Sequence, residues 1–463
     1  MNGVLLALVA YVVLQFAVGV WFSRAMQTEA DYIIAGRRLG IGLVTFSVFS
    51  TYFGAEAIVA TAGSVHEKGL SGALVDPFAY AAAILLVAVF FAARLWRADL
   101  VTFADFFRVR YSPGVERLVV LVLLPGSVLW AAAQVRAFGQ VLSANSTLSL
   151  STAIGLAALL VGVYSVVGGL LADAVTDLIQ GVVVMVGLSI LGLAVVHHMG
   201  SFTAALAIVP PERLAFGFDG SLLKTLETIA VPVCGTIVAV ELVSRFLGAR
   251  SGHDAAWGTL IGGVMYVLVG QIPIFLGLVG PVLMPDLKDA EQIVPKLASA
   301  YLTPVLHVIF TGAVVSAILS AVHAALHAPA AQVSHNLLTR LIPKMSDLHR
   351  LWSVRLTVAV LAGVAYVLAL TSETIKDLVE TASAFGSAGV FVVTVFGLFT
   401  NYGSATSAYA AICTGVVVWA VGRWGLHLET PYLLALAGAM GAYFAVAIYQ
   451  LQQPCKPAAT IKT

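Results

Sequence analysis

Charged residues are scarce in this chain. Asp, Glu, Lys and Arg together make up 10% of its 463 residues, hydrophobic residues make up 60%, and the mean hydropathy is +0.99. These values exclude a water-soluble globular protein. Apolar runs recur along the whole sequence, and runs of about twenty residues are long enough to cross a hydrocarbon core of roughly 30 Å as helices. The sequence therefore predicts an integral membrane protein embedded in a lipid bilayer.

Cysteines and catalytic motifs are also scarce. The three cysteines, Cys234, Cys413 and Cys455, are widely spaced and odd in number, so neither a disulfide framework nor a zinc site is expected. No phosphate-binding glycine loop, nucleophile elbow or pair of catalytic carboxylates occurs, which argues against an ATP-driven pump and against an enzyme. The net charge of +1 without basic patches gives no indication of nucleic-acid binding. No obligate protein partner is evident.

Hydropathy predicts an all-α polytopic membrane protein with about thirteen transmembrane helices. The first run lacks the basic n-region and the cleavage site of a signal peptide, so we expect a retained helix there. The expected spans are 3–23, 39–62, 72–96, 115–143, 151–171, 174–197, 226–247, 255–284, 303–338, 351–371, 376–400, 404–422 and 431–450.

The distribution of Lys and Arg predicts the orientation in the membrane. With the N-terminus outside and the C-terminus in the cytoplasm, sixteen of the 24 Lys and Arg residues, Arg245 among them, fall in inner segments and seven fall outside, while Arg136 lies within a span. Positive residues are enriched on the cytoplasmic side of membrane proteins. We therefore expect this orientation in a plasma membrane of the bacterial inner-membrane type.

Two of the expected spans carry residues that interrupt helices. The second span has Ser50, Gly54 and Glu56 near its centre, and the seventh has Pro232 and Gly235. Interrupted helices at corresponding places in two halves are typical of transporters built from inverted repeats, with the binding site at the interruptions. Proline and glycine are also frequent in ordinary transmembrane helices.

Several stretches, taken in order, resemble the sodium:solute symporter family. YSVVGGLLADAVTDLIQG, residues 164–181, is similar to the family signature across a helix junction. The same holds for DYIIAGRRLG, STYFGAEAIVATAG, LVTFADFFRVRY and AFGSAGVFVVTVFGLFT, and the resemblance extends over 31–425. It implies a LeuT-like inverted repeat of five plus five core helices and transport by alternating access. On that basis we expect an N-terminal extra helix in 1–30, the two repeats in 31–200 and 201–400, and two further helices with a cytoplasmic tail in 401–463.

The resemblance also implies a Na⁺ site between the first and eighth core helices. The matching carbonyl positions are Ser50, Phe53 and Ala317, and the Ser320 hydroxyl faces them. A second hydroxyl is usual in the family, but Ala321 stands there. Na⁺ is a hard cation that takes oxygen ligands, so it is the expected coupling ion with one ligand missing.

Some members of the family have a second cation site, and its matching positions here include Asp177 and His323. A hydroxyl is usual where His323 stands, and an imidazole changes its charge near neutral pH. Three interpretations are open: a second cation site, a proton site formed by His323 with Asp177, or a fixed positive charge in place of an ion. His323 and His327 lie one helical turn apart and could instead share a metal ion or hydrogen-bond to neighbouring helices.

Five residues are candidates for solute contact. Tyr52, Glu56 and Cys234 lie near the expected interruptions, and the resemblance implies that Gln134, on the third core helix, and Glu380, on the tenth, border the solute path.

Three further polar residues have structural as well as functional interpretations. Arg136 could bind an anionic solute or reach the outer interface. Glu241 and Arg245 are four residues apart, which favours a structural pair on one helix face.

The sequence as a whole predicts a secondary active transporter that moves a small organic solute together with a cation, most simply Na⁺. Two alternatives remain. One is a proton-coupled or cation-independent transporter that uses His323 and Asp177. The other is a membrane sensor that binds solute without productive transport and signals through a separate partner chain.

Overall fold

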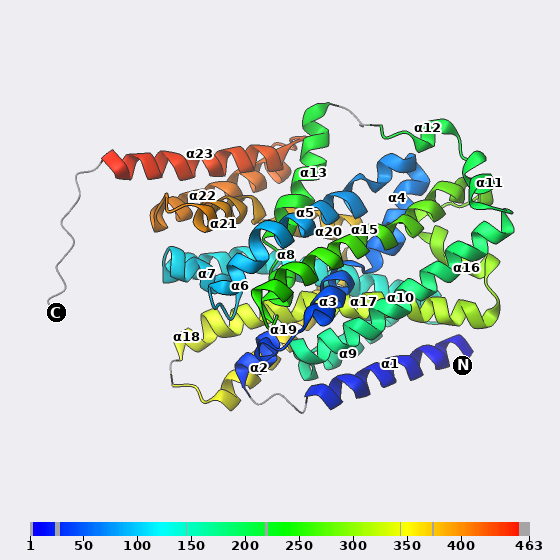
Figure 1. Cartoon of the computed structure of the whole chain (residues 1–463), viewed down its shortest axis with the longest axis horizontal. Helices are drawn as coiled ribbons and strands as arrows, with labels where there is room; N and C mark the ends of the chain where they lie inside the picture. Colours follow the sequence, from blue (N-terminus) through cyan, green and yellow to red (C-terminus); the bar gives the residue numbers. More distant parts are fainter. Residues whose placement is uncertain are drawn as a thin grey trace.

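The structure, a computed structural model, describes residues 3–23, 28–144, 146–217, 221–342, 344–372 and 375–452. Within these ranges the fold is all-helical, without β-strands, and one isolated β-bridge pairs Leu39 with Ala249. Most of the long helices run along the long axis of the molecule (Figure 1). Helices suit a bilayer because they satisfy their backbone hydrogen bonds internally. The predicted all-α class is confirmed.

The helices differ widely in length. Those of twelve residues or more are α1 (Gly3–Ser23), α3 (Ile41–Tyr52), α8 (Pro113–Ala144), α9 (Leu150–Val167), α10 (Leu170–His198), α13 (Leu222–Ile237), α15 (Gly252–Leu283), α17 (Pro304–Gln332), α19 (Asp347–Thr371), α21 (Ser387–Phe399), α22 (Ala405–Ala420) and α23 (Pro431–Gln452). The shorter ones are α2 (Glu29–Ile34), α4 (Thr61–Lys68), α5 (Tyr80–Leu86), α6 (Ala93–Arg97), α7 (Phe103–Arg110), α11 (Phe202–Ala207), α12 (Pro211–Leu214), α14 (Val240–Leu247), α16 (Ile293–Tyr301), α18 (Thr339–Leu341) and α20 (Ile375–Ala384). The 3₁₀ and π segments are η1 (Ala35–Arg37), η2 (Glu56–Ala60), η3 (Gly69–Ala73), η4 (Leu74–Ala79), η5 (Val87–Ala92), η6 (Ala290–Gln292), η7 (Val333–Leu338) and η8 (Val421–Gly425).

In the described part of the chain, eleven helices are long and apolar enough to cross a membrane, so the predicted count of thirteen is not confirmed. The difference arises partly at the second and third expected spans. The first half of the second span is α3, which has only 12 residues, and the second half belongs to a continuous helical run, Glu56–Arg97. This run is not straight. Gly69 has a φ of +65°, which favours glycine, and turns the chain between α4 and η3.

Helix α3 lies at the centre of the bundle, where it contacts α10, α14, α15 and α17. Close approach to α15 requires glycine: a Cβ atom on Gly262 would lie 2.8 Å from the Thr45 carbonyl oxygen. Small residues are typical of such contacts between membrane helices. At the periphery, α1 lies against α10 and α17, while α22 and α23 pack together with α21 at the opposite edge (Figure 1). The most enclosed part of the molecule is therefore the surroundings of α3.

Candidate functional site

The first interrupted helix breaks directly after α3. Phe53, with a ψ of 61°, ends the helical path, and a short turn leads into η2. The Gly54 amide donates to the Tyr52 carbonyl at 2.9 Å, and the Ala55 amide donates to Gln134 Oε1 at 3.4 Å. In an unbroken helix these two amides would serve the carbonyls of residues 50 and 51. The break therefore takes these helical donors away from the carbonyls of Ser50 and Thr51, of which only Ser50 is among the carbonyl positions named from the sequence.

The second interrupted helix breaks three residues beyond the predicted glycine. Helix α13 continues through Pro232 and Gly235 to Ile237, and Val238 and Ala239 form the break before α14. Gly235 has a packing role, because a Cβ atom there would lie 2.6 Å from the Ser383 carbonyl oxygen of α20. The expected interruption is present, but these two residues do not themselves end the helix.

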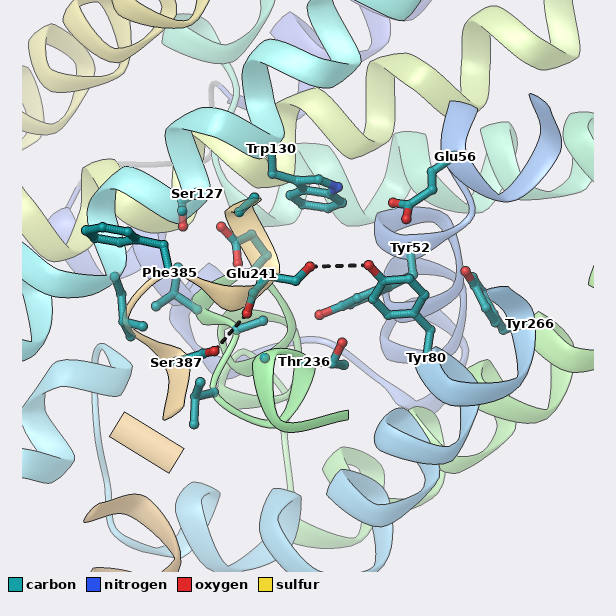
Figure 2. Close-up of a pocket in the computed structure, with 18 residues that line it drawn as sticks. Tyr52, Glu56, Tyr80, Ser127, Trp130, Thr236, Glu241, Tyr266, Phe385 and Ser387 are labelled. Atoms are coloured by element: carbon teal, nitrogen blue, oxygen red, sulfur yellow. Dashed lines mark hydrogen bonds between the residues drawn. The ribbon is translucent and has the colours of Figure 1, made fainter. Parts of the chain in front are cut away.

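Both breaks border one cavity (Figure 2). Its lining also includes residues of α8, α15, α20 and the start of α21. The lining residues are Tyr52, Glu56, Tyr80, Leu123, Gly126, Ser127, Trp130, Gly235, Thr236, Val238, Ala239, Val240, Glu241, Tyr266, Ala382, Ser383, Phe385 and Ser387. The two interrupted helices thus meet at one cavity lined by residues from several helices.

The cavity combines aromatic rings with carboxylates. The ring of Tyr52 lies 6.2 Å from that of Tyr80 and 6.0 Å from that of Trp130, measured between centroids. Glu56 directs its carboxylate toward these rings (Figure 2), and Glu241 supplies a second one. No Lys, Arg or His occurs among the described residues that line the cavity. Aromatic faces and carboxylates both attract cations.

A buried ionic cluster, formed by Asp173, Asp177, Arg245 and His323, also lies beside the first break. Each of these side chains is at most 1% exposed. Arg245 forms an ion pair with Asp173 and approaches Asp177, with Nη1 3.9 Å from Oδ2. His323 Nδ1 lies 2.8 Å from Asp173 Oδ1, although the two atoms do not meet in hydrogen-bond geometry. Arg245 Nε donates to Thr51 Oγ1 at 2.9 Å, which links the cluster to the end of α3.

Asp177 is held mainly by hydroxyl groups. Ser47 Oγ donates to its Oδ2 at 2.7 Å, and Ser320 Oγ donates to its Oδ1. The Ser50 hydroxyl donates to the backbone carbonyl of Asp177 at 3.0 Å. Hydroxyls stabilise a carboxylate without neutralising it. With Arg245 committed to Asp173, an ionised Asp177 leaves the cluster with one uncompensated negative charge whenever His323 is neutral.

Comparison with known proteins decides the family. The profile of the sodium:solute symporter family matches residues 32–415. This chain belongs to the sodium:solute symporter family. It is therefore a cation-coupled symporter of a small solute and not an enzyme, as the sequence predicts.

Relatives of known function and solved structures agree with this family. The symporter is similar to the high affinity choline transporter 1 of Homo sapiens, at 25% identity over 436 residues, which cover 88% of this chain and 74% of the relative. The sodium/pantothenate symporter of Escherichia coli K12 is 26% identical over 474 residues, with coverages of 96% and 98%.

The fold is LeuT-like. A Na⁺-coupled sialic acid symporter in an outward-open, substrate-bound state matches with a TM-score of 0.86 at 16% identity, over 98% of this chain and 99% of the other. A transporter of the nucleobase-cation-symport-1 family matches with a TM-score of 0.65 at 13% identity, over 92% and 95%.

The structure places the predicted solute residues of the symporter in different surroundings. Tyr52 and Glu56 line the cavity. Gln134 lies behind the first break, where it accepts from the Ala55 amide. Cys234 is buried in a separate apolar cluster with Trp419 and Tyr432, and Glu380 is exposed. The last three are not among the residues that line the cavity.

The predicted cation residues lie closer together than the sequence indicates. Ser320, assigned to the first site, hydrogen-bonds to Asp177, assigned to the second. Ala317 precedes Ser320 by one turn of α17, and Ala321 faces the first break, since a Cβ atom on Gly54 would lie 3.0 Å from the Ala321 Cβ. The nearest ion-pair partner of His323 in the described chain is Asp173 and not Asp177.

The predicted structural pair of Glu241 with Arg245 is wrong. Arg245 is paired with Asp173 inside the bundle, so it is not a cytoplasmic charge, and Glu241 lines the cavity. The i,i+4 rule failed because both side chains turn toward other helices. Arg136 donates to the Ala369 carbonyl at the end of α19, at 3.0 Å.

His327 and His335 have partners outside the cavity. His327 Nε2 lies 3.0 Å from the Tyr32 carbonyl, and His335 Nδ1 lies 3.2 Å from Glu29 Oε1. No group of three or more His, Cys, Asp or Glu side chains in the described ranges could hold a metal ion. His327 thus contacts a neighbouring helix, in line with the hydrogen-bonding interpretation.

Sequence reasoning missed Asp173 and Ser47, and it named Arg245 only as an inner charge and as a partner of Glu241. The signal for Asp173 is its spacing from Asp177, since residues four apart in α10 share one helix face. Two carboxylates on one buried face call for a cation from another helix. That requirement points to the few basic residues within apolar runs, and Arg245 is one of them.

The charge balance of the cluster predicts different effects on the free energy of unfolding for two substitutions that each remove one charge. Arg245→Gln leaves two adjacent buried carboxylates and should lower the free energy of unfolding by about 3 kcal/mol, the cost of breaking a buried pair. Asp177→Asn removes the uncompensated charge and should cause no comparable loss. Thermal unfolding of both purified variants in Na⁺-free buffer checks this, and an equal loss in both would contradict the charge assignment.

Proposed function

We propose that this symporter couples Na⁺ to the inward movement of a small organic cation. One observation carries the proposal: a cavity of aromatic rings and carboxylates, and a carboxylate without a committed cation, lie beside the same helix break. The cavity would take the solute and Asp177 would take the ion. Because both sites share the break after α3, occupation of one can change the affinity of the other through the conformation of that segment.

Oxygen atoms suited to Na⁺ surround Asp177. Its carboxylate contacts the hydroxyls of Ser47 and Ser320, and the break frees nearby backbone carbonyls. Carboxylate, hydroxyl and carbonyl oxygens are the ligands that hard cations prefer. Asp177 supplies a charged oxygen next to the position where Ala321 lacks a hydroxyl. We therefore propose one Na⁺ site, with ligands drawn from Ser47, Ser50, Phe53, Asp177, Ala317 and Ser320.

The cavity favours a positively charged solute. A quaternary ammonium group is attracted to the faces of Tyr52, Tyr80 and Trp130, and Glu56 lies beside these rings. Choline, the solute named for several relatives, is such a cation. Pantothenate, named for another relative, is a carboxylate, and the lining offers it no Lys, Arg or His. The charge of the cavity therefore supports a choline-like solute for this chain.

We also propose the orientation and repeat organisation that the sequence predicts. The N-terminus would lie outside and the C-terminus inside, in a bacterial inner membrane. Arg245 no longer counts as an inner charge, but fifteen inner Lys and Arg residues still exceed the seven outer ones. The breaks after α3 and α13 fall in 31–200 and 201–400, at comparable places in the two proposed repeats.

Proton coupling is the second candidate function, favoured by the 2.8 Å approach of His323 to Asp173. The imidazole of His323 is also packed against Tyr164 and His327, each with a centroid distance of 5.4 Å. A proton on His323 would balance the cluster in the same way as Na⁺ at Asp177. The two candidates therefore differ in which cation the cluster takes up.

Ion coupling can be tested by uptake of radiolabelled choline into proteoliposomes. An inward Na⁺ gradient should accelerate uptake by the parent chain more than a K⁺ gradient does, and Asp177→Asn should remove this dependence. Ala321→Ser adds an oxygen at the break and should lower the Na⁺ concentration for half-maximal uptake. Proton coupling would be supported instead if uptake is independent of Na⁺, is driven by a pH gradient and is lost in His323→Ala.

The charge of the solute can be tested with an isosteric pair of competitors. Choline should inhibit uptake, whereas its uncharged carbon analogue, 3,3-dimethyl-1-butanol, should not. Trp130→Leu and Glu56→Gln should each raise the KM for choline about tenfold, which corresponds to about 1.4 kcal/mol and is the scale of a desolvated cation–π contact. Glu380→Gln is the matched control, since it removes a carboxylate outside the lining. Equal inhibition by both competitors would contradict a cationic solute.

A further inference from the structure

Arg245 lies within reach of both carboxylates of the buried ionic cluster. It follows the second break directly, on α14, and is 1% exposed. Its Nη1 contacts Asp173 and lies 3.9 Å from Asp177 Oδ2, and its Nε donates to Thr51 at the end of α3. Its buried Nη2 has no hydrogen-bond acceptor among the described residues. The guanidinium therefore has one donor without an acceptor, and its Nη1 lies close to a carboxylate with which it forms no hydrogen bond.

On the proposed function, the empty carrier must return to the outward-facing state while the buried Asp177 carboxylate has no Na⁺ beside it. A symporter that has released its ion and solute inside must return empty to the outward-facing state. Release of Na⁺ leaves the buried Asp177 carboxylate with hydroxyl partners only. An uncompensated charge inside the bundle is costly and would oppose any closed intermediate on the return path. A cation already attached to the protein and shared between the two carboxylates would lower this cost.

We propose that Arg245 is a tethered counter-cation that bridges Asp173 and Asp177 when the ion site is empty. In the loaded carrier Na⁺ serves Asp177 and Arg245 serves Asp173. After release, a movement of the guanidinium by about 1 Å toward Asp177 would bring the 3.9 Å separation to hydrogen-bond length. The planar fork of an arginine can donate to two carboxylates at once, which a lysine ammonium does less well. His323, beside Asp173, would help to hold that carboxylate in the bridged state.

The bridge would also connect the ion site to both interrupted helices. Arg245 belongs to the segment after the second break, while Thr51 belongs to the helix before the first. A shift of the guanidinium toward Asp177 changes its contact with Thr51, so loss of the ion is communicated to α3. This inference rests on the proposed function, because it assigns the transported Na⁺ to Asp177.

The test separates the return of the empty carrier from the loaded steps. The double variant Asp173→Asn, Arg245→Gln removes the pair together, so the net charge of the cluster stays equal to that of the parent chain. In proteoliposomes with Na⁺ and choline on both sides, it should exchange labelled choline at a rate within about threefold of the parent. Net uptake, which requires the empty carrier to return, should fall at least tenfold. Arg245→Lys keeps a cation and should retain part of the net uptake.

Each outcome decides the question. Net uptake by the double variant at the parental rate would overturn the proposal, and so would equal losses of exchange and net uptake, which indicate a purely structural pair. Failure of the proposed function looks different, because exchange by the parent chain would then be independent of Na⁺.

A second measurement needs no solute. Na⁺, compared with K⁺, should raise the unfolding temperature of the double variant more than that of the parent, since Arg245 already shares its charge with Asp177 in the empty parent. Equal shifts in the two proteins would contradict the bridge.

Discussion

The buried carboxylate of Asp177 is the constraint on which the rest of the site depends. It lies in the most enclosed part of the bundle, receives two serine hydroxyls and has no committed cation, because Arg245 is paired with Asp173. A lone buried charge is among the least favourable features that a protein interior can contain. It persists where a ligand compensates it, and a coupling cation is such a ligand. On the proposed function, this charge deficit is the physical reason for an ion at Asp177.

On the proposed function, the helix breaks bring ion and solute into one piece of structure. Phe53 and Gly54 interrupt the backbone hydrogen bonds of α3, and Tyr52 and Glu56, on either side of this break, line the cavity. Val238 and Ala239, which form the second break, line the same cavity. An ion can shift the balance of two carrier conformations only by its differential affinity for them. A break that borders both proposed sites would be a physical means for that difference.

Much of this arrangement could be predicted from the sequence. Gly54 beside polar residues indicated the first break, and Pro232 with Gly235 indicated the second within a few residues. The motif order indicated the family. The sequence did not predict which side chains point from their helices into the cavity. Cys234 and Glu380 lie on helices that border the cavity, but they do not line it. Apolar sequences carry little periodic signal for which face is inside, because nearly every face is apolar.

The prediction of the partner of Arg245 failed for a different reason. The spacing of Glu241 and Arg245 satisfied a local rule that applies to exposed helices. Inside a bundle, tertiary partners compete with neighbours on the same helix, and Asp173 on α10 offered a fully buried carboxylate. Such a partner is identified by counting the charges of all the helices that pack around it. This count requires the positions of the residues near α3, which the linear sequence does not give.

The most direct test of the account is the number of Na⁺ ions moved with each solute. Reversal-potential measurements on proteoliposomes, in which the Na⁺ gradient and the membrane voltage are varied against a fixed choline gradient, give this number. One uncompensated carboxylate and one tethered guanidinium predict one Na⁺ per choline, and therefore two positive charges per cycle. Two Na⁺ ions per solute, or flux equilibria that do not respond to Na⁺, would contradict the account.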